Sequence, residues 1–176
     1  RVLFRSAKNP IQLIKDFEHC FTTLWKDRLG QISLAVTTLF WGAGATLQFI
    51  VLKWAESALG MTLSEGAILQ AVVAFGVAGG AVWAAWKVPL KKSLSVLKYG
   101  VIMGALVMLM AIFRKDLLPH IDISFGIFEM PLYLLVAYIF LMTIGWMSGY
   151  FVVPMNALLQ HRGHVLLSAG HSIAVQ

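Results

Sequence analysis

The chain has 176 residues, of which 59% are hydrophobic and only 12% are charged, and its mean hydropathy is +0.80. A water-soluble domain needs more charge to cover its surface, so this composition excludes an ordinary soluble protein and indicates a membrane protein. The single cysteine, Cys20, excludes a disulfide framework and a cysteine-rich metal site.

Both ends of the sequence suggest a piece of a longer protein. The chain begins without Met, and residues 1–6 resemble translated adapter sequence rather than native protein, so they are left out of the fold prediction. It stops at Gln176, about twelve residues into an apolar segment that is too short to cross a bilayer. We therefore expect a fragment.

The stretch from Pro10 to Trp25 is predicted to form an amphipathic helix within a cytoplasmic segment at residues 7–30. Its apolar side chains recur at helical spacing and are Ile14, Phe17, Phe21, Leu24 and Trp25. This pattern is typical of a helix that lies on the inner membrane surface. A linker helix packed on other cytoplasmic loops fits the pattern equally well, so both interpretations stay open.

Four apolar runs then approach the roughly 20 residues that a helix needs to cross hydrocarbon. The runs cover residues 32–52, 66–86, 94–113 and 131–153, and residues 165–176 look like the start of another. We therefore predict an all-α, polytopic membrane helix bundle over residues 31–176.

The loops between these runs alternate in charge. Eleven of the fourteen Lys and Arg residues lie before the first run, between the second and third, or after the fourth, and nine remain without residues 1–6. Only Lys53, Arg114 and Lys115 fall on the opposite side. The positive-inside rule therefore places the N-terminal segment and the loops at 87–98 and 155–164 in the cytoplasm. Because the net charge of +6 follows topology, we do not expect nucleic-acid binding.

Three of the runs contain the Gly-x-x-x-Gly spacing, which places two glycines on one helix face and lets a second helix approach closely. The pairs are Gly76 with Gly80, Gly100 with Gly104, and Gly145 with Gly149. Close helix packing is the simpler interpretation, and seams that slide during a conformational cycle are the alternative.

The middle of the first run holds Trp41, Gly42, Gly44 and, about one turn further on, Gln48. Each glycine costs roughly 1 kcal/mol in helix propensity, so either tight packing or a bend beside a cavity is expected there. A polar side chain such as Gln48 within the membrane usually faces the bundle or a water-filled path.

The fourth run ends near Pro154, and Asn156 and Gln160 follow four residues apart. If the helix continues past the proline, the two amides share one face near the cytoplasmic side. Such amides either lock two helices together or bind a polar headgroup. Arg162 and His164 are expected to be solvated loop charges, with lipid phosphates as the alternative contact.

The spans lack the constellations of an enzyme. They contain no Ser/His/Asp set and no paired carboxylates, and no histidine cluster has metal-ligand geometry. The glycine-rich stretches lack the Gly-Lys-Ser/Thr of a phosphate loop. We therefore expect neither catalysis nor a cofactor nor a metal in this chain.

Two stretches resemble one family, the bacterial lysophospholipid transporters of the major facilitator superfamily. Residues 39–49 (LFWGAGATLQF) with 58–62 (ALGMT) are similar to the family's seventh helix and the loop after it. Residues 150–163 (YFVVPMNALLQHRG) with 168–176 (SAGHSIAVQ) are similar to its tenth-to-eleventh helix region. The resemblance covers most of residues 7–176.

This resemblance implies helices seven to ten, and the start of eleven, in the C-terminal six-helix half of a twelve-helix carrier. It implies transport of lysophospholipids, chiefly lysophosphatidylethanolamine, across the bacterial inner membrane to an acyltransferase, separate or fused, that reacylates them. In this superfamily the substrate sits near the midplane between two halves that rock. Trp41 and Gln48, with Asn156 and Gln160, are the candidate substrate residues. The candidate hinge or packing residues are Gly42, Gly44, Gly76, Gly80, Gly145, Gly149 and Pro154.

Two departures from the family pattern bear on this hypothesis. A basic residue can occupy the position of Gln48, and residues 87–92 lack the acidic residue of the superfamily's gating motif. Another carrier of the superfamily, for drugs or metabolites, is one alternative, although it would often carry charges within the membrane for proton coupling. A membrane enzyme of lipid metabolism is a weaker alternative.

Overall fold

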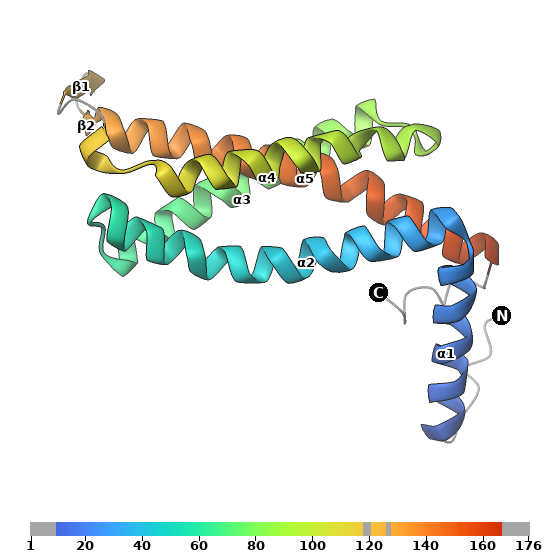
Figure 1. Ribbon diagram of the computed structural model, residues 1–176. Helices are drawn as coiled ribbons and strands as arrows, with labels where there is room; N and C mark the ends of the chain where they lie inside the picture. The colour runs from blue at the N-terminus through green and yellow to red at the C-terminus, as the bar shows by residue number, and fades with distance from the viewer. Residues whose placement is uncertain (1–9, 118–120, 126–127, 167–176) are drawn as a thin grey trace. The chain divides into compact units, whose positions relative to one another are not determined.

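The computed structural model describes residues 10–117, 121–125 and 128–166 (Figure 1). The predicted start of a further span at 165–176 lies almost wholly outside this range. The elements in chain order are α1 (Pro10–Lys26), α2 (Arg28–Trp54), the π-helix η1 (Ala55–Leu59), α3 (Leu63–Lys87), the 3-10 helix η2 (Leu90–Val96), α4 (Leu97–Ile112), the 3-10 helix η3 (Lys115–Leu117), β1 (Asp122–Phe125), β2 (Phe128–Pro131) and α5 (Leu132–Leu166).

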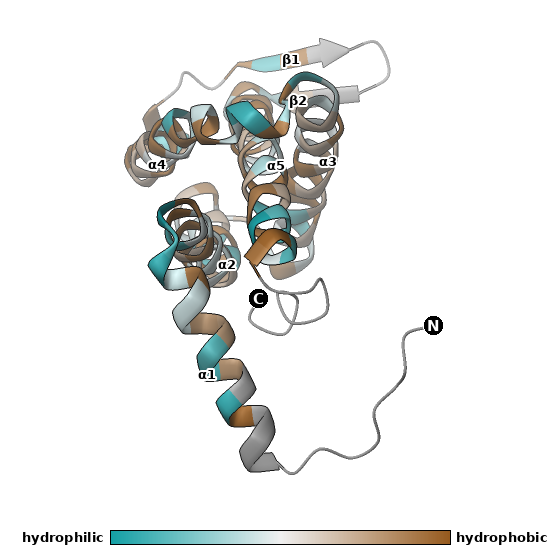
Figure 2. Cartoon of the chain, turned by 90° about the vertical axis from the view of Figure 1, so that its right-hand side faces the viewer, coloured by the Kyte–Doolittle hydropathy of each residue, from teal (hydrophilic) through white to brown (hydrophobic). Residues whose placement is uncertain are grey.

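Four helical segments of the described chain are long and apolar enough to cross a membrane. They are Arg28–Leu59, Leu63–Lys87, Leu90–Ile112 and Leu132–Leu166. Figure 2 shows largely hydrophobic residues along α2 to α5, whereas α1 carries hydrophilic and hydrophobic residues side by side. The predicted polytopic helix bundle is confirmed, and the structure adds one short antiparallel hairpin in which Asp122 pairs with Pro131 and Ser124 with Glu129.

The helix ends differ from the predicted spans for local reasons. At the start of α3, the Thr62 hydroxyl accepts a hydrogen bond from the Glu65 amide, and the Glu65 carboxylate accepts one from the Thr62 amide at 2.7 Å. This capping box satisfies two of the free amides at the helix start. The helix therefore begins at Leu63, three residues before the predicted span.

α5 continues through Pro154 to Leu166, over residues that were predicted to form a cytoplasmic loop. A proline within a helix removes one backbone hydrogen bond and usually kinks or breaks the helix. Here Met155, Leu158 and Leu159 are almost fully buried just after it. Their burial favours the helical conformation enough to offset the lost bond.

The chain divides into two compact units. Of the described residues, the terminal unit combines 10–39 with 155–166, and the central unit holds those between 40 and 154. Within the central unit a hydrophobic core forms where α2 and η1 meet α3, α4 and α5. Its most buried members are Ala55, Leu69, Ala137 and Leu141. The Trp54 indole N–H also donates to the Phe113 carbonyl at 3.2 Å. This hydrogen bond joins the end of α2 to the end of α4.

The glycine pairs of α3 and α5 face each other in the central unit. A β-carbon at Gly76 would overlap the Met142 carbonyl, and one at Gly80 would overlap that of Trp146. In the opposite direction, a β-carbon at Gly145 would overlap the Val73 carbonyl. A β-carbon at Gly149 would likewise overlap the Val77 carbonyl. These contacts agree with the packing interpretation of both pairs, because each glycine lets the other helix's backbone approach.

Candidate functional site

The central unit encloses a groove of about 760 Å³ between α2, α3, α4 and α5, which we call the central groove. Most of the residues that line it are apolar, among them Val51, Val73, Val107, Leu141 and Ile144. The polar lining residues are Gln48, Lys53 and Ser57 from α2 and η1, Gln70 from α3, and Ser148 from α5. An apolar channel with a few polar groups is the usual character of a small-molecule site.

Two of the four substrate residues predicted from the sequence line this groove. Trp41 and Gln48 are both exposed to it from α2, together with Gly44. The Gln70 side-chain amide donates a hydrogen bond to the Gln48 carbonyl at 2.7 Å, which links α2 to α3. Gln48 was predicted to face the bundle or a water-filled path, and it lines the central groove.

The other two predicted substrate residues lie in the terminal unit. Asn156 is partly buried and Gln160 is exposed, and both stand on the continuous helix α5. Their four-residue spacing on an unbroken helix gives them a common face. They do not belong to the set of residues that lines the central groove.

The glycines of α2 differ from those of α3 and α5. A β-carbon at Gly42 or Gly44 would meet no atom within 4 Å, so tight packing within the described chain does not explain either residue. Gly44 lines the central groove, whereas Gly42 does not. The two members of the third glycine pair also differ. A β-carbon at Gly100 would lie 2.8 Å from the Phe151 ring, whereas one at Gly104 would meet no atom within 4 Å.

The groove extends along one half of α2. Trp41 lies at the middle of the helix Arg28–Trp54, and Lys53 lies at the end predicted to face outside. Twelve residues at 1.5 Å per residue separate them by about 18 Å along the axis. Half of a hydrocarbon core of roughly 30 Å is about 15 Å. The groove therefore has approximately the length of one bilayer leaflet.

Lys53 is the charged residue among those lining the central groove, and its place in the sequence indicated only topology. Its ammonium lies 2.8 Å from the Glu56 carboxylate, and the two side chains are 75% and 64% exposed. The Ser57 hydroxyl donates to the Lys53 carbonyl at 2.8 Å. In the sequence, a single cation at the end of an apolar span with a carboxylate three residues later is the pattern that could have indicated a polar site there.

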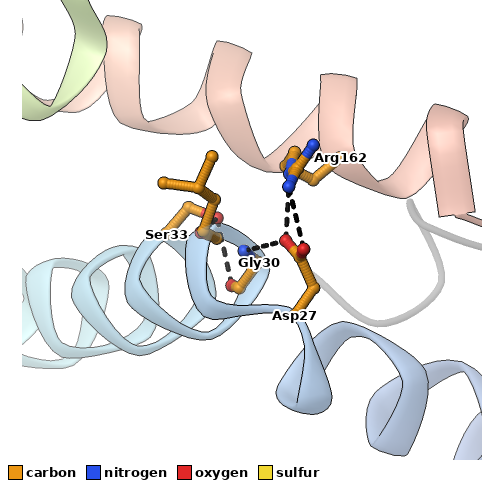
Figure 3. Close-up of polar contacts among 5 residues, drawn as sticks. Asp27, Gly30, Ser33 and Arg162 are labelled. Atoms are coloured by element: carbon orange, nitrogen blue, oxygen red, sulfur yellow. Dashed lines mark hydrogen bonds and ion pairs between the residues drawn. The ribbon is translucent and has the colours of Figure 1, made fainter.

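A second polar cluster belongs to the terminal unit (Figure 3). The Arg162 guanidinium donates two hydrogen bonds to Asp27, from Nε to Oδ2 at 2.9 Å and from Nη2 to Oδ1 at 2.8 Å. The Gly30 amide donates to the same Oδ2 at 2.8 Å, so Asp27 also caps the N-terminus of α2. Arg162, expected to be a solvated loop charge, instead holds the start of α2 to the end of α5 within this unit.

Gly30 is required by the same geometry, because a β-carbon there would lie 2.6 Å from the Leu24 carbonyl oxygen. Burial by itself would raise the pKa of the Asp27 carboxyl. The hydrogen bond from Gly30 and the hydrogen bonds and charge of Arg162 together outweigh burial, so the pKa is lowered from its ordinary value. Asp27 therefore remains a carboxylate at neutral pH, and the ion pair is intact.

The helices define a polytopic α-helical membrane protein, and its central unit contains a largely apolar groove with a few polar residues. The chain is 40% identical over 169 residues to the lysophospholipid transporter LplT of Shigella boydii serotype 4 (strain Sb227). It is 39% identical to the proteins of the same name from Shigella sonnei (strain Ss046) and Escherichia coli (strain K12 / DH10B). Each match covers 96% of this chain and 38% of the relative.

The predicted resemblance to the bacterial lysophospholipid transporters is therefore confirmed over nearly the whole chain, which spans 38% of the length of these relatives. The relatives are named as transporters and not as enzymes. With the four membrane-capable helices, they support a multi-pass protein of the bacterial inner membrane. No protein-family model and no solved structure matches the chain.

Proposed function

We propose that the protein in which this chain occurs moves lysophospholipids across the bacterial inner membrane. The relatives carry this function in their name, and the central groove has the chemistry for such a substrate. A lysophospholipid has one acyl chain and one polar headgroup. The groove likewise has an apolar body and a charged end at Lys53.

The groove's dimensions carry the proposal. From Trp41 to Lys53 it extends about 18 Å, close to the depth of one leaflet, so a single acyl chain fits along it with the headgroup at the membrane surface. A lipid with two chains presents twice the apolar width to the same channel. Gln48 and Gln70 lie part-way along the groove, where their amides offer hydrogen bonds to the glycerol and ester oxygens.

Transport further requires that the groove open alternately to the two sides of the membrane. Carriers of this superfamily do so by rocking one half against the other around a site near the midplane. The close α3–α5 packing through four glycines keeps this part of the chain rigid enough to move as one body. Trp41, at the middle of α2, then contacts the end of the acyl chain.

The reacylation step belongs to a partner. We propose that an acyltransferase that uses an acyl-carrier protein, separate or fused to this chain, consumes the lysophospholipid on the inner side. Release of a lysophosphatidylethanolamine-type product to such an enzyme follows from the direction of transport, and a pull-down from membranes tests the contact.

Uptake of labelled lysophosphatidylethanolamine into spheroplasts tests the proposed function. The complete reading frame is expressed in cells that lack their own transporter, and Trp41→Ala is compared with Trp86→Ala, whose indole is also exposed but outside the groove. We expect uptake to fall at least fivefold for the first variant and to stay unchanged for the second. Absence of uptake by the unmodified protein contradicts the proposal.

A steric pair of variants gives the same test a sharper form. Gly42 and Gly44 both have open space around them, and only Gly44 lines the groove. Gly44→Leu should therefore block the channel and reduce uptake, while Gly42→Leu should leave it unchanged. Equal effects of the two substitutions would show that the central groove does not hold the acyl chain. If cells that express the protein take up no lysolipid but accumulate less of an unrelated drug than cells without it, the alternative of a drug or metabolite carrier is favoured.

A further inference from the structure

Two opposite charges lie beside the end of the central groove, one of them on a lining residue, Lys53, and the other on Glu56, which is not among the lining residues. Lys53 and Glu56 lie three residues apart at the junction of α2 and η1, with Nζ and Oε2 separated by 2.8 Å. Lys53 lines the groove itself. Both side chains are mostly exposed, so an incoming molecule can reach either charge without displacing other protein groups.

We infer that Lys53 and Glu56 form a recognition site for a zwitterionic phosphoethanolamine headgroup. This inference rests on the proposed function. The headgroup carries a phosphate and an ammonium joined by two carbons, and the site offers an ammonium and a carboxylate at adjacent positions. Lys53 binds the phosphate and Glu56 binds the ammonium. The ion pair between Lys53 and Glu56 opens, and each side chain forms a new ion pair with the group of opposite charge on the lipid.

Exchange of partners is energetically reasonable at this position. An exposed ion pair between residues three apart on one helix contributes little to stability, so opening it costs little. Charge-assisted hydrogen bonds to phosphate and to ammonium replace it.

The position of the pair agrees with a leaflet-length groove. With the acyl chain extending toward Trp41, the headgroup of a lipid from the outer leaflet reaches the end of α2 at Lys53. This is the end that the charge distribution predicts to face outside. Gln48 is neutral where a basic residue can occur in the family, so the cation among the residues that line the central groove is Lys53.

Headgroup selectivity in reconstituted vesicles tests the inference. The complete protein is given lysophosphatidylethanolamine, which carries both charges, or lysophosphatidylglycerol, which has the phosphate but no ammonium. Glu56→Gln should lower the uptake ratio of the first lipid to the second at least threefold, and Glu56→Asp should restore most of it. Lys53→Gln should raise the half-saturating concentration of both lipids severalfold, because both need the phosphate contact.

Two matched controls are available on the side that is predicted to face outside. Asp116 and Arg114 are exposed and do not line the groove, so Asp116→Asn and Arg114→Gln should leave the ratio and the half-saturating concentrations unchanged. An unchanged ratio in Glu56→Gln, with normal uptake by the unmodified protein, overturns the headgroup site alone. Absence of lysolipid uptake by the unmodified protein overturns both the site and the proposed function.

Discussion

Gly80 of α3 lies so close to the Trp146 carbonyl of α5 that no β-carbon fits between them. Two helices in a membrane gain no hydrophobic free energy from their association, because lipid is as apolar as their side chains. Close contact between the two backbones instead stabilises the association through dispersion and weak Cα–H···O hydrogen bonds. The packing of α3 on α5 in the central unit therefore depends on glycine at this position.

Gly80→Ala should destabilise the central unit. The added methyl group must push α3 and α5 apart, which costs about 2 kcal/mol or more by analogy with overpacked cores. Thermal unfolding in detergent micelles measures this as a lower midpoint. Gly104→Ala is the matched control, since its β-carbon meets open space and the helix propensity of alanine is favourable by roughly 1 kcal/mol. A midpoint for Gly80→Ala as high as that of the control would contradict the packing described.

The ion pair between Asp27 and Arg162 should make stability depend on acid. The folded-state pKa of Asp27 lies below its unfolded value. Its contribution is therefore complete above the unfolded pKa of about 4 and is lost as the pH falls through the folded pKa. We expect the unfolding midpoint of the unmodified protein to decline below about pH 4, and part of that decline to be absent from Asp27→Asn.

At pH 7 Asp27→Asn should be less stable by about 1.5 to 3 kcal/mol, the usual value of hydrogen bonds to a charged group. Asp116→Asn, at an exposed carboxylate outside the ion pair, serves as control and should retain the full pH dependence. Identical pH profiles for the unmodified protein and Asp27→Asn would mean that the pair does not contribute. Arg162→Lys tests the geometry, because lysine lacks the planar fork that binds both carboxylate oxygens.

Helix α1 keeps its exposed aromatic residues on one side. Phe17, Phe21 and Trp25 are stacked, with ring centroids 6.5 and 5.5 Å apart, and all three are at least 40% exposed. Of the two interpretations from the sequence, an interfacial helix accounts for these residues because lipid can cover them. Packing on other cytoplasmic loops stays the competing prediction.

A spin label decides between the two interpretations. With Cys20 replaced by Ser, a label at Phe17→Cys should be accessible to oxygen and shielded from a water-soluble nickel complex. A label at Lys15→Cys, on the polar side of the same helix, should show the opposite. Accessibility to nickel at both positions would place α1 in water, and protection from both reagents at position 17 would indicate protein packing instead.

The sequence alone was sufficient for the membrane class, the four spans and the family resemblance. Apolar runs of about 20 residues leave few alternatives in water, and the positive-inside rule adds a predicted orientation. Trp41 and Gln48 were proposed as substrate residues on the family resemblance. A polar side chain such as Gln48 within a membrane usually faces the bundle or a water-filled path, while the midspan glycines left tight packing as an alternative to a cavity. These features depend on composition and local order along the chain.

Tertiary structure decided which glycines pack and which face space. Gly44 and Gly80 have the same local preference, yet Gly44 lines the groove and Gly80 meets Trp146, since only the partner helix distinguishes them. The ion pair of Asp27 with Arg162 joins residues 135 positions apart, a separation at which sequence spacing carries no information. The same holds for Lys53, whose place at the end of the groove depends on the walls that three other helices provide.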